Sequence, residues 1–260
     1  MPQYRKSNIP FIRYILIAVI MYLVFNLSND NPLSPPNIRV KSSTTTSSST
    51  STTDTWINED NFAIVQLIDI PTVYISPGIG KFVSRLEHMR ELTKRVGFLN
   101  VTHYQSGTEA YPKCLVRAVI DLLQQHLDTG PFLLLEDDVE WHGQNILRIP
   151  LDADAVYLGV SGNAGHVKKN KRDGPAKFEP YNDDWKRVLN MLSGHAILFI
   201  SRGYMEHVIS ILEPLLSLPP QHKDVVMSRT QIGFRIYAPR GKPIFYQSPK
   251  FGGQKNTNPK

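Results

Sequence analysis

Three adjacent carboxylates, Glu136, Asp137 and Asp138, directly follow the apolar run FLLL at 132–135. A continuously apolar run of this length predicts a strand that is buried on both faces. Side chains at i and i+2 of a strand point the same way, so Glu136 and Asp138 would converge. Neighbouring carboxylates repel one another unless a cation is bound, and oxygen ligands suit Mn²⁺ or Mg²⁺. The motif therefore predicts a metal site, with a solvated acidic turn as the alternative.

Strand-like and helix-like patterns alternate on both sides of this motif. Two apolar patterns with helical spacing, over 81–97 and 114–127, separate the first three predicted strands. A further helix is predicted over 203–216. The predicted strands are 72–76, 101–106, 132–135, 155–160, 195–201, 234–239 and 243–247. This order predicts an α/β fold with a mostly parallel, Rossmann-type sheet flanked by helices, formed by one domain over 57–249. Ligands of such sheets bind beyond the carboxyl ends of the strands.

The N-terminal segment predicts a membrane anchor. Residues 9–27 are apolar apart from Pro10, Arg13 and Asn26, which is close to the length that a transmembrane helix needs. Arg5 and Lys6 precede this run and Arg13 lies near its start, whereas the first charge after it is Asp30, so the positive-inside rule places residues 1–8 in the cytoplasm. A cleaved signal peptide is the alternative, but no small-residue cleavage site follows the run.

A stalk is predicted at 28–56, because thirteen of the fourteen residues at 42–55 are Ser or Thr. Such a run has too little apolar surface to fold, and it is either a plain spacer or a carrier of O-glycans. Asn100 begins an N-glycosylation sequon.

The charge distribution argues against a nucleic-acid partner. The net charge is +6, but residues 57–249 hold 21 basic and 21 acidic side chains. The excess lies in 1–56 and in the basic tail 250–260, whereas nucleic-acid binding requires a basic patch on the folded body. The single cysteine, Cys114, excludes an intrachain disulfide and a cysteine-based zinc site.

The segment PFLLLEDDVEW at 131–141 resembles the acidic motif of glycosyltransferase family 25, which includes lipopolysaccharide-type and collagen galactosyltransferases. Other segments resemble parts of this family in the same order over 70–248. They are TVYIS (72–76), GFLNV (97–101), AVYLGVSG (155–162), SGHAILFISRGYMEHVI (193–209), LPPQHKDVVMSR (218–229) and IYAPRGKPIFYQ (236–247).

The resemblance implies a GT-A-like fold, a nucleotide-sugar donor and a Mn²⁺ or Mg²⁺ ion. Asp138 would then bind the metal, and Glu136 would lie near the metal or the donor ribose. His195 is a third candidate ligand, although a lone histidine beside an apolar strand is more often structural. Asp224 would orient or deprotonate the acceptor hydroxyl, with a helix N-terminal acid as the alternative.

Donor binding is assigned to Ser76, Arg85 and Asp137, although a helix-surface arginine is ordinarily solvated. Two groups of side chains are further candidates. They are the basic cluster Lys168, Lys169, Lys171 and Arg172, either a solvated loop or a cover for a diphosphate, and Trp141 and Trp185, for packing or sugar stacking. The segments 76–82 and 113–118 differ from the family pattern at positions that help to hold the donor, which leaves the donor open.

The sequence thus predicts a type II membrane glycosyltransferase of the Golgi or endoplasmic reticulum, with a luminal catalytic domain. It would transfer a sugar, galactose or glucose, from a UDP-sugar to a glycan or glycoprotein hydroxyl. Two alternatives remain open. One is a metal-dependent phosphohydrolase or nucleotidyltransferase, and the other is a degenerate transferase fold that binds a glycan or a partner.

Overall fold

A computed structural model describes residues 58–59, 61–165 and 174–251. The chain divides into units 1–51 and 52–260, and all the described residues belong to the second. The predicted anchor, nearly all of the basic tail and the cluster at 168–172 lie outside the described residues, as does the stalk. Within the described part of the chain, no helix is long and apolar enough to cross a membrane.

The centre of the domain is an eight-stranded sheet with the order β4-β3-β5-β11-β8-β12-β10-β9. Strands β11 and β10 are antiparallel to both of their neighbours, and the other six strands share one direction. The strand bounds are β3 Thr72–Ser76, β4 Val101–Gln105, β5 Phe132–Glu136, β8 Ala155–Tyr157, β9 Lys177–Pro180, β10 Trp185–Asn190, β11 Ala196–Phe199 and β12 Ile236–Pro239.

Two small antiparallel sheets and four α-helices complete the described domain. One sheet joins β1 (Asn58–Glu59), β2 (Phe62–Gln66) and β7 (Ile146–Pro150), and the other joins β6 (Val139–Trp141) to β13 (Phe245–Gln247). The helices are α2 Val83–Val96, α3 Lys113–His126, α4 Arg202–Leu212 and α5 Lys223–Ser228. Short 3₁₀ turns lie at Leu67–Asp69, Gly80–Phe82, Glu213–Leu216, Gln231–Gly233 and Pro249–Phe251.

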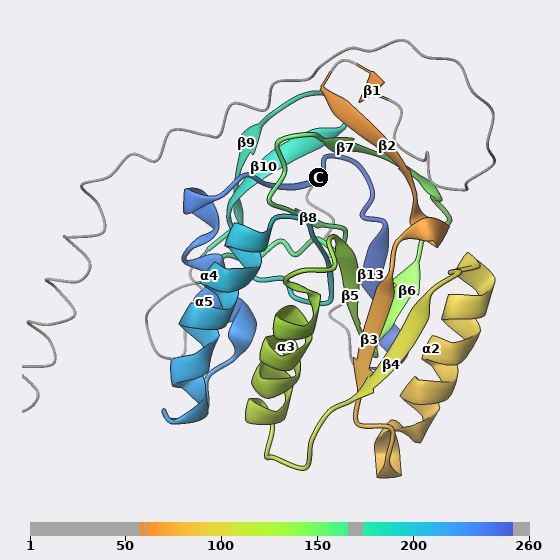
Figure 1. Cartoon of the computed structure of the whole chain (residues 1–260), viewed down its shortest axis with the longest axis vertical. Coiled ribbons are helices and arrows are strands. Elements are labelled where there is room, and N and C mark those ends of the chain that lie inside the picture. The colour runs from red at the N-terminus through yellow and green to blue at the C-terminus, as the bar shows by residue number, and fades with distance from the viewer. Residues whose placement is uncertain (1–57, 60, 166–173, 252–260) are drawn as a thin grey trace, which may run out of the picture. The chain divides into compact units, whose positions relative to one another are not determined.

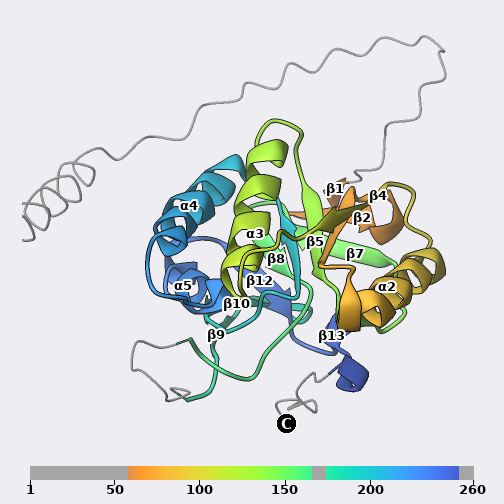
Figure 2. The same cartoon turned by 90° about the horizontal axis from the view of Figure 1, so that it is seen from below.

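Helices cover both faces of the main sheet, as Figures 1 and 2 show. Phe132 and Leu134 of β5 belong to an apolar cluster with α3 and α4, whereas Leu133 and Leu135 belong to a second cluster with α2, β2 and β7. Alternate side chains of one strand thus enter two different cores, which explains why FLLL is apolar at every position.

The structure confirms the α/β class and the strand at each predicted position, with most directions shared. It also contains strands that were not predicted from the sequence, which are β1, β2, β6, β7, β9 and β10. Strand β13 lies outside the main sheet, paired with β6. The sheet is mixed, because β11 lies antiparallel between β5 and β8.

Candidate functional site

Several strand ends meet at one edge of the sheet. Strand β5 ends at Glu136, and the loops that follow β8 and β12 begin at the same edge. Strand β11 is antiparallel, so its first residues, preceded by His195, also lie there. A pocket of about 490 Å³ opens at this edge, which is the position expected for the ligand of an α/β sheet and a size typical of ligand pockets.

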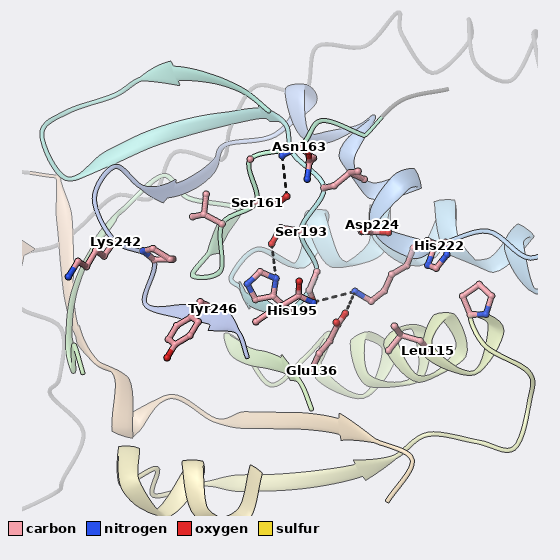
Figure 3. Close-up of a pocket in the computed structure, with 18 of the residues that line it drawn as sticks. Leu115, Glu136, Ser161, Asn163, Ser193, His195, His222, Asp224, Lys242 and Tyr246 are labelled. Atoms are coloured by element: carbon pink, nitrogen blue, oxygen red, sulfur yellow. Dashed lines mark hydrogen bonds and ion pairs between the residues drawn. The ribbon is translucent and has the colours of Figure 1, made fainter. Parts of the chain in front are cut away.

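Cations outnumber carboxylates around this pocket. Among the described lining residues the Lys and Arg side chains are Lys186, Lys223, Arg240 and Lys242, and the carboxylates are Glu136 and Asp224. His195, Lys242 and the pair His222 and Asp224 surround the pocket from three different segments of the chain (Figure 3). A pocket with this balance favours an anionic ligand.

Glu136 is held in the pocket by the register between β5 and β11 and by a buried lysine. Its backbone N–H donates to the carbonyl of His195 at 2.9 Å, and its Oε1 lies 2.8 Å from Nζ of Lys223. Burial opposes ionisation of Glu136, but the Lys223 ammonium outweighs it and lowers the carboxyl pKa below its usual value. Burial likewise opposes the charge on Lys223, while Glu136 and Asp224 raise its pKa. Both groups are therefore charged at neutral pH.

His195 is buried and neutral. Burial lowers its pKa to about 4, against the opposing charge of Glu136. Its Nδ1 lies 3.3 Å from Oγ of Ser193, which donates to the carbonyl of Gly159 at 2.8 Å. A Cβ on Gly159 would lie 2.0 Å from Nε2 of His195, so the imidazole needs glycine there. Nε2 is buried without a hydrogen-bond partner in the described chain.

Ser76, Arg85 and Asp137 form a hydrogen-bonded group of their own. Asp137 accepts from Ser76 Oγ and from Arg85 Nη1, each at 2.9 Å, and Arg85 Nη2 donates to the carbonyl of Phe251 at 2.8 Å. None of the three side chains lines the pocket. The structure brings them together but gives them partners within the protein, so donor binding by these residues stays a prediction.

Asp138 is not among the residues that line the pocket. Its Oδ2 accepts from Gln247 at 3.4 Å, and its Oδ1 is buried without a partner among the described residues. Burial, followed by the charge of Glu136, raises the pKa of Asp138 to about 7.

The described side chains do not fit the predicted divalent metal site. No group of three or more His, Cys, Asp or Glu residues that could hold a metal ion occurs among the residues that the structure describes. The three predicted ligands are Glu136, Asp138 and His195. Only Glu136 and His195 line the pocket, and Glu136 is paired with the ammonium group of Lys223. A divalent cation at Glu136 would lie next to the charge of Lys223 and be repelled by it.

Asp224 lines the pocket at the start of α5, where its Oδ1 accepts from the N–H of Val225 at 3.0 Å.

Trp185 is buried and its indole donates to the carbonyl of Arg148, so it has a packing role. Trp141 packs partly buried against a core cluster, and its indole donates to the carbonyl of Gln144. Neither tryptophan lines the pocket.

The sequence analysis missed four cations of the pocket, which are Lys186, Lys223, Arg240 and Lys242. Lys186 belongs to a strand that was not predicted. Lys223 directly precedes Asp224 in a segment that was singled out for its acid. The position of Arg240 and Lys242 just after a predicted strand was a usable signal, because such loops line ligand sites.

No protein-family model matches the chain, and neither does any curated protein sequence. The solved structures that resemble it include CTP:phosphocholine cytidylyltransferase from Streptococcus pneumoniae, with 8% identity over 69% of this chain and 93% of that chain and a TM-score of 0.36. They also include apo UDP-glucose pyrophosphorylase, with 10% identity over 70% of this chain and 77% of that chain and a TM-score of 0.36. Similarity of this extent decides neither the family nor the activity of this chain, and the resemblance to glycosyltransferase family 25 stays a prediction.

Proposed function

We propose that this protein is a glycosyltransferase that binds the diphosphate of a nucleotide sugar in the pocket at the carboxyl edge of the sheet. The observation that carries the proposal is the charge of this pocket, where four Lys and Arg side chains face two carboxylates. A diphosphate carries concentrated negative charge, and lysine and arginine are its ordinary ligands in proteins.

The remaining pocket groups suit a sugar transfer. Asp224 is a carboxylate on the pocket wall, where it can accept the proton of an acceptor hydroxyl. Tyr246 and Tyr111 also line the pocket and offer aromatic surface to a sugar or a base. The acceptor in this proposal is a glycan or glycoprotein hydroxyl, and the donor is a UDP-sugar that carries galactose or glucose.

The cellular setting is part of the same proposal, whereas the metal is not. An anchor at 9–27 and a stalk at 28–56 would place the transferase domain in the lumen of the Golgi or endoplasmic reticulum. The Mn²⁺ or Mg²⁺ ion stays a prediction of the sequence resemblance, and it is tested by including and omitting the metal.

The test uses the full chain, purified in detergent. Calorimetry measures binding of UDP, GDP, CDP and ADP and of a panel of their sugar conjugates, with Mn²⁺ and with EDTA, while product analysis follows the released sugar and diphosphate. The double variant Arg240→Met/Lys242→Met removes two exposed cations of the rim. Since a hydrogen bond to a charged group contributes about 1.5–3 kcal/mol, we expect the variant to weaken binding by at least tenfold.

Lys94→Met is the control, because Lys94 is exposed on α2 and lies outside the pocket; we expect it to bind as the wild type does. Release of pyrophosphate from a nucleoside triphosphate would instead identify a nucleotidyltransferase. A folded protein that binds no nucleotide under either condition would contradict the proposed function and favour a glycan- or partner-binding module.

A further inference from the structure

The ammonium group of Lys223 lies between Glu136 and Gly194, which both line the pocket, and its contacts with them hold it in place. Lys223 is the first residue of α5 and is only 3% exposed. Its Nζ lies 2.8 Å from Oε1 of Glu136 and donates to the carbonyl of Gly194 at 3.2 Å. Figure 3 shows Glu136 at the pocket, with a dashed line drawn from its carboxylate.

Three separate segments fix this position. Glu136 comes from the end of β5, Gly194 from the loop before β11, and Lys223 from the start of α5. A Cβ on Gly194 would lie 2.1 Å from the lysine Nζ. Residue 194 therefore has to be glycine for the ammonium to reach both acceptors, because the side chain of any larger residue would occupy the position of the ammonium.

Burying a lysine is costly, and a buried ion pair is weak support for stability by itself. An ammonium has three N–H donors, and the described residues provide acceptors for two of them. The remaining donor belongs to a group that lines the pocket. A ligand with negatively charged oxygens would complete its hydrogen bonding.

The same pair argues against a metal site at the acidic motif. Glu136, which the sequence predicts to be a metal ligand, is already paired with a cation of the protein itself, the ammonium group of Lys223. No set of three metal-ligating side chains accompanies it among the described residues.

We propose that Lys223 is the fixed cation of this pocket, that it binds the diphosphate of the donor without a divalent metal, and that Glu136 is its positioning residue. This inference rests on the proposed function, and it identifies the group that takes the place of the metal. A charge that is already oriented before the reaction stabilises a developing negative charge without reorganisation.

In the transfer step, one bond of the donor breaks and one bond to the acceptor forms. The bond between the anomeric carbon and the diphosphate oxygen breaks, and its electron pair stays on that oxygen. The acceptor hydroxyl oxygen forms the new bond to the anomeric carbon, and its proton passes to the carboxylate of Asp224. Lys223 donates its remaining hydrogen bond to the departing diphosphate and keeps its protons.

The experiment measures binding of UDP, GDP, CDP and ADP to the full chain in detergent, in EDTA and in Mn²⁺. For the wild type we expect at least one diphosphate to bind with a Kd that differs by less than threefold between the two conditions. Lys223→Met should weaken this binding by at least 100-fold in both, and Lys94→Met should leave it unchanged. Glu136→Gln should weaken it about tenfold, equally with and without Mn²⁺, because the lysine loses the negative charge that positions its ammonium and favours its charged form.

If Lys223→Met does not fold, the double variant Lys223→Met/Glu136→Leu replaces the pair by apolar side chains, which buried sites often tolerate; it should also fail to bind. A diphosphate that binds the wild type only with Mn²⁺ would overturn this inference and leave the proposed function standing. A folded Lys223→Met protein, or a folded double variant, that binds as the wild type does would also overturn it. A wild type that binds no diphosphate under either condition would overturn the proposed function itself.

Discussion

The three neighbouring carboxylates have three different environments. Glu136 is paired with Lys223, Asp137 with Arg85 and Ser76, and Asp138 has one oxygen without a partner in the described chain. The sequence was sufficient to locate this motif at the end of a buried strand. It was insufficient to assign the environments, because the partners come from residues 52 to 109 positions away in the chain.

The raised pKa of Asp138 makes stability depend on pH. Its pKa is about 7 in the folded protein and about 3.9 in an unfolded chain. The folded state therefore binds more protons between these values, and the free energy of unfolding falls as pH rises from about 4 to about 7. Asp138→Asn removes this dependence. Between pH 5.5 and pH 8.0 we expect the wild type to lose about 2 kcal/mol more than the variant.

Urea unfolding at the two pH values measures this difference. Asp183→Asn is the control, since Asp183 is a fully exposed carboxylate, and it should change with pH as the wild type does. Equal pH dependence in wild type and Asp138→Asn would mean that this carboxyl titrates normally.

At the scale of elements, Arg85 joins α2 to the C-terminal turn Pro249–Phe251. Its guanidinium bonds the carboxylate of Asp137 and the carbonyl of Phe251, and the Phe251 ring lies 5.5 Å from it. We expect Arg85→Ala to lower the free energy of unfolding by about 2 kcal/mol, because it leaves the largely buried Asp137 with only Ser76. Hydrogen exchange of the Phe251 amide should also become faster, since the turn loses its contact.

Arg95→Ala is the matched control. Arg95 also extends from α2 to an acid, Glu140, but its side chain is 56% exposed, and exposed pairs contribute about 0.2–1 kcal/mol. Equal losses of stability for the two variants, measured by urea unfolding, would show that Arg85 is no more than a surface pair.

The predictability of the elements depended on their apolar patterns. Strands β3, β8 and β11 are buried at every position, and β5 is buried at its four apolar positions, so runs of apolar letters located them. Strands β9 and β10 were not predicted because half of the residues in each are polar or charged and they lie at one end of the sheet. The antiparallel direction of β11 was also not predicted, since the apolar pattern of a buried strand is the same in either direction. It nevertheless decides the site, because it brings His195 beside Glu136.

At the scale of the molecule, charge is distributed unevenly over a body that is neutral as a whole. Residues 57–249 hold 21 basic and 21 acidic side chains, yet four Lys and Arg side chains line one pocket with two carboxylates. The composition therefore describes only the average charge of the domain. The local excess of cations arises because the fold brings β5, β10, β12 and α5 to one edge of the sheet.

This distribution predicts that the protein prefers small anions to long polyanions. Raising the salt concentration from 50 to 500 mM should weaken diphosphate binding several-fold, because screening reduces the attraction of exposed rim cations. Arg240→Met/Lys242→Met should reduce that salt dependence, as both residues are exposed at the rim, whereas Lys94→Met should preserve it. A 20-base-pair DNA duplex should bind at least tenfold more weakly than the diphosphate at 150 mM salt, since a neutral body gives a duplex few phosphate contacts. Duplex binding as tight as that of the diphosphate would show that the basic surface extends beyond the pocket, and would reopen a nucleic-acid role for this chain.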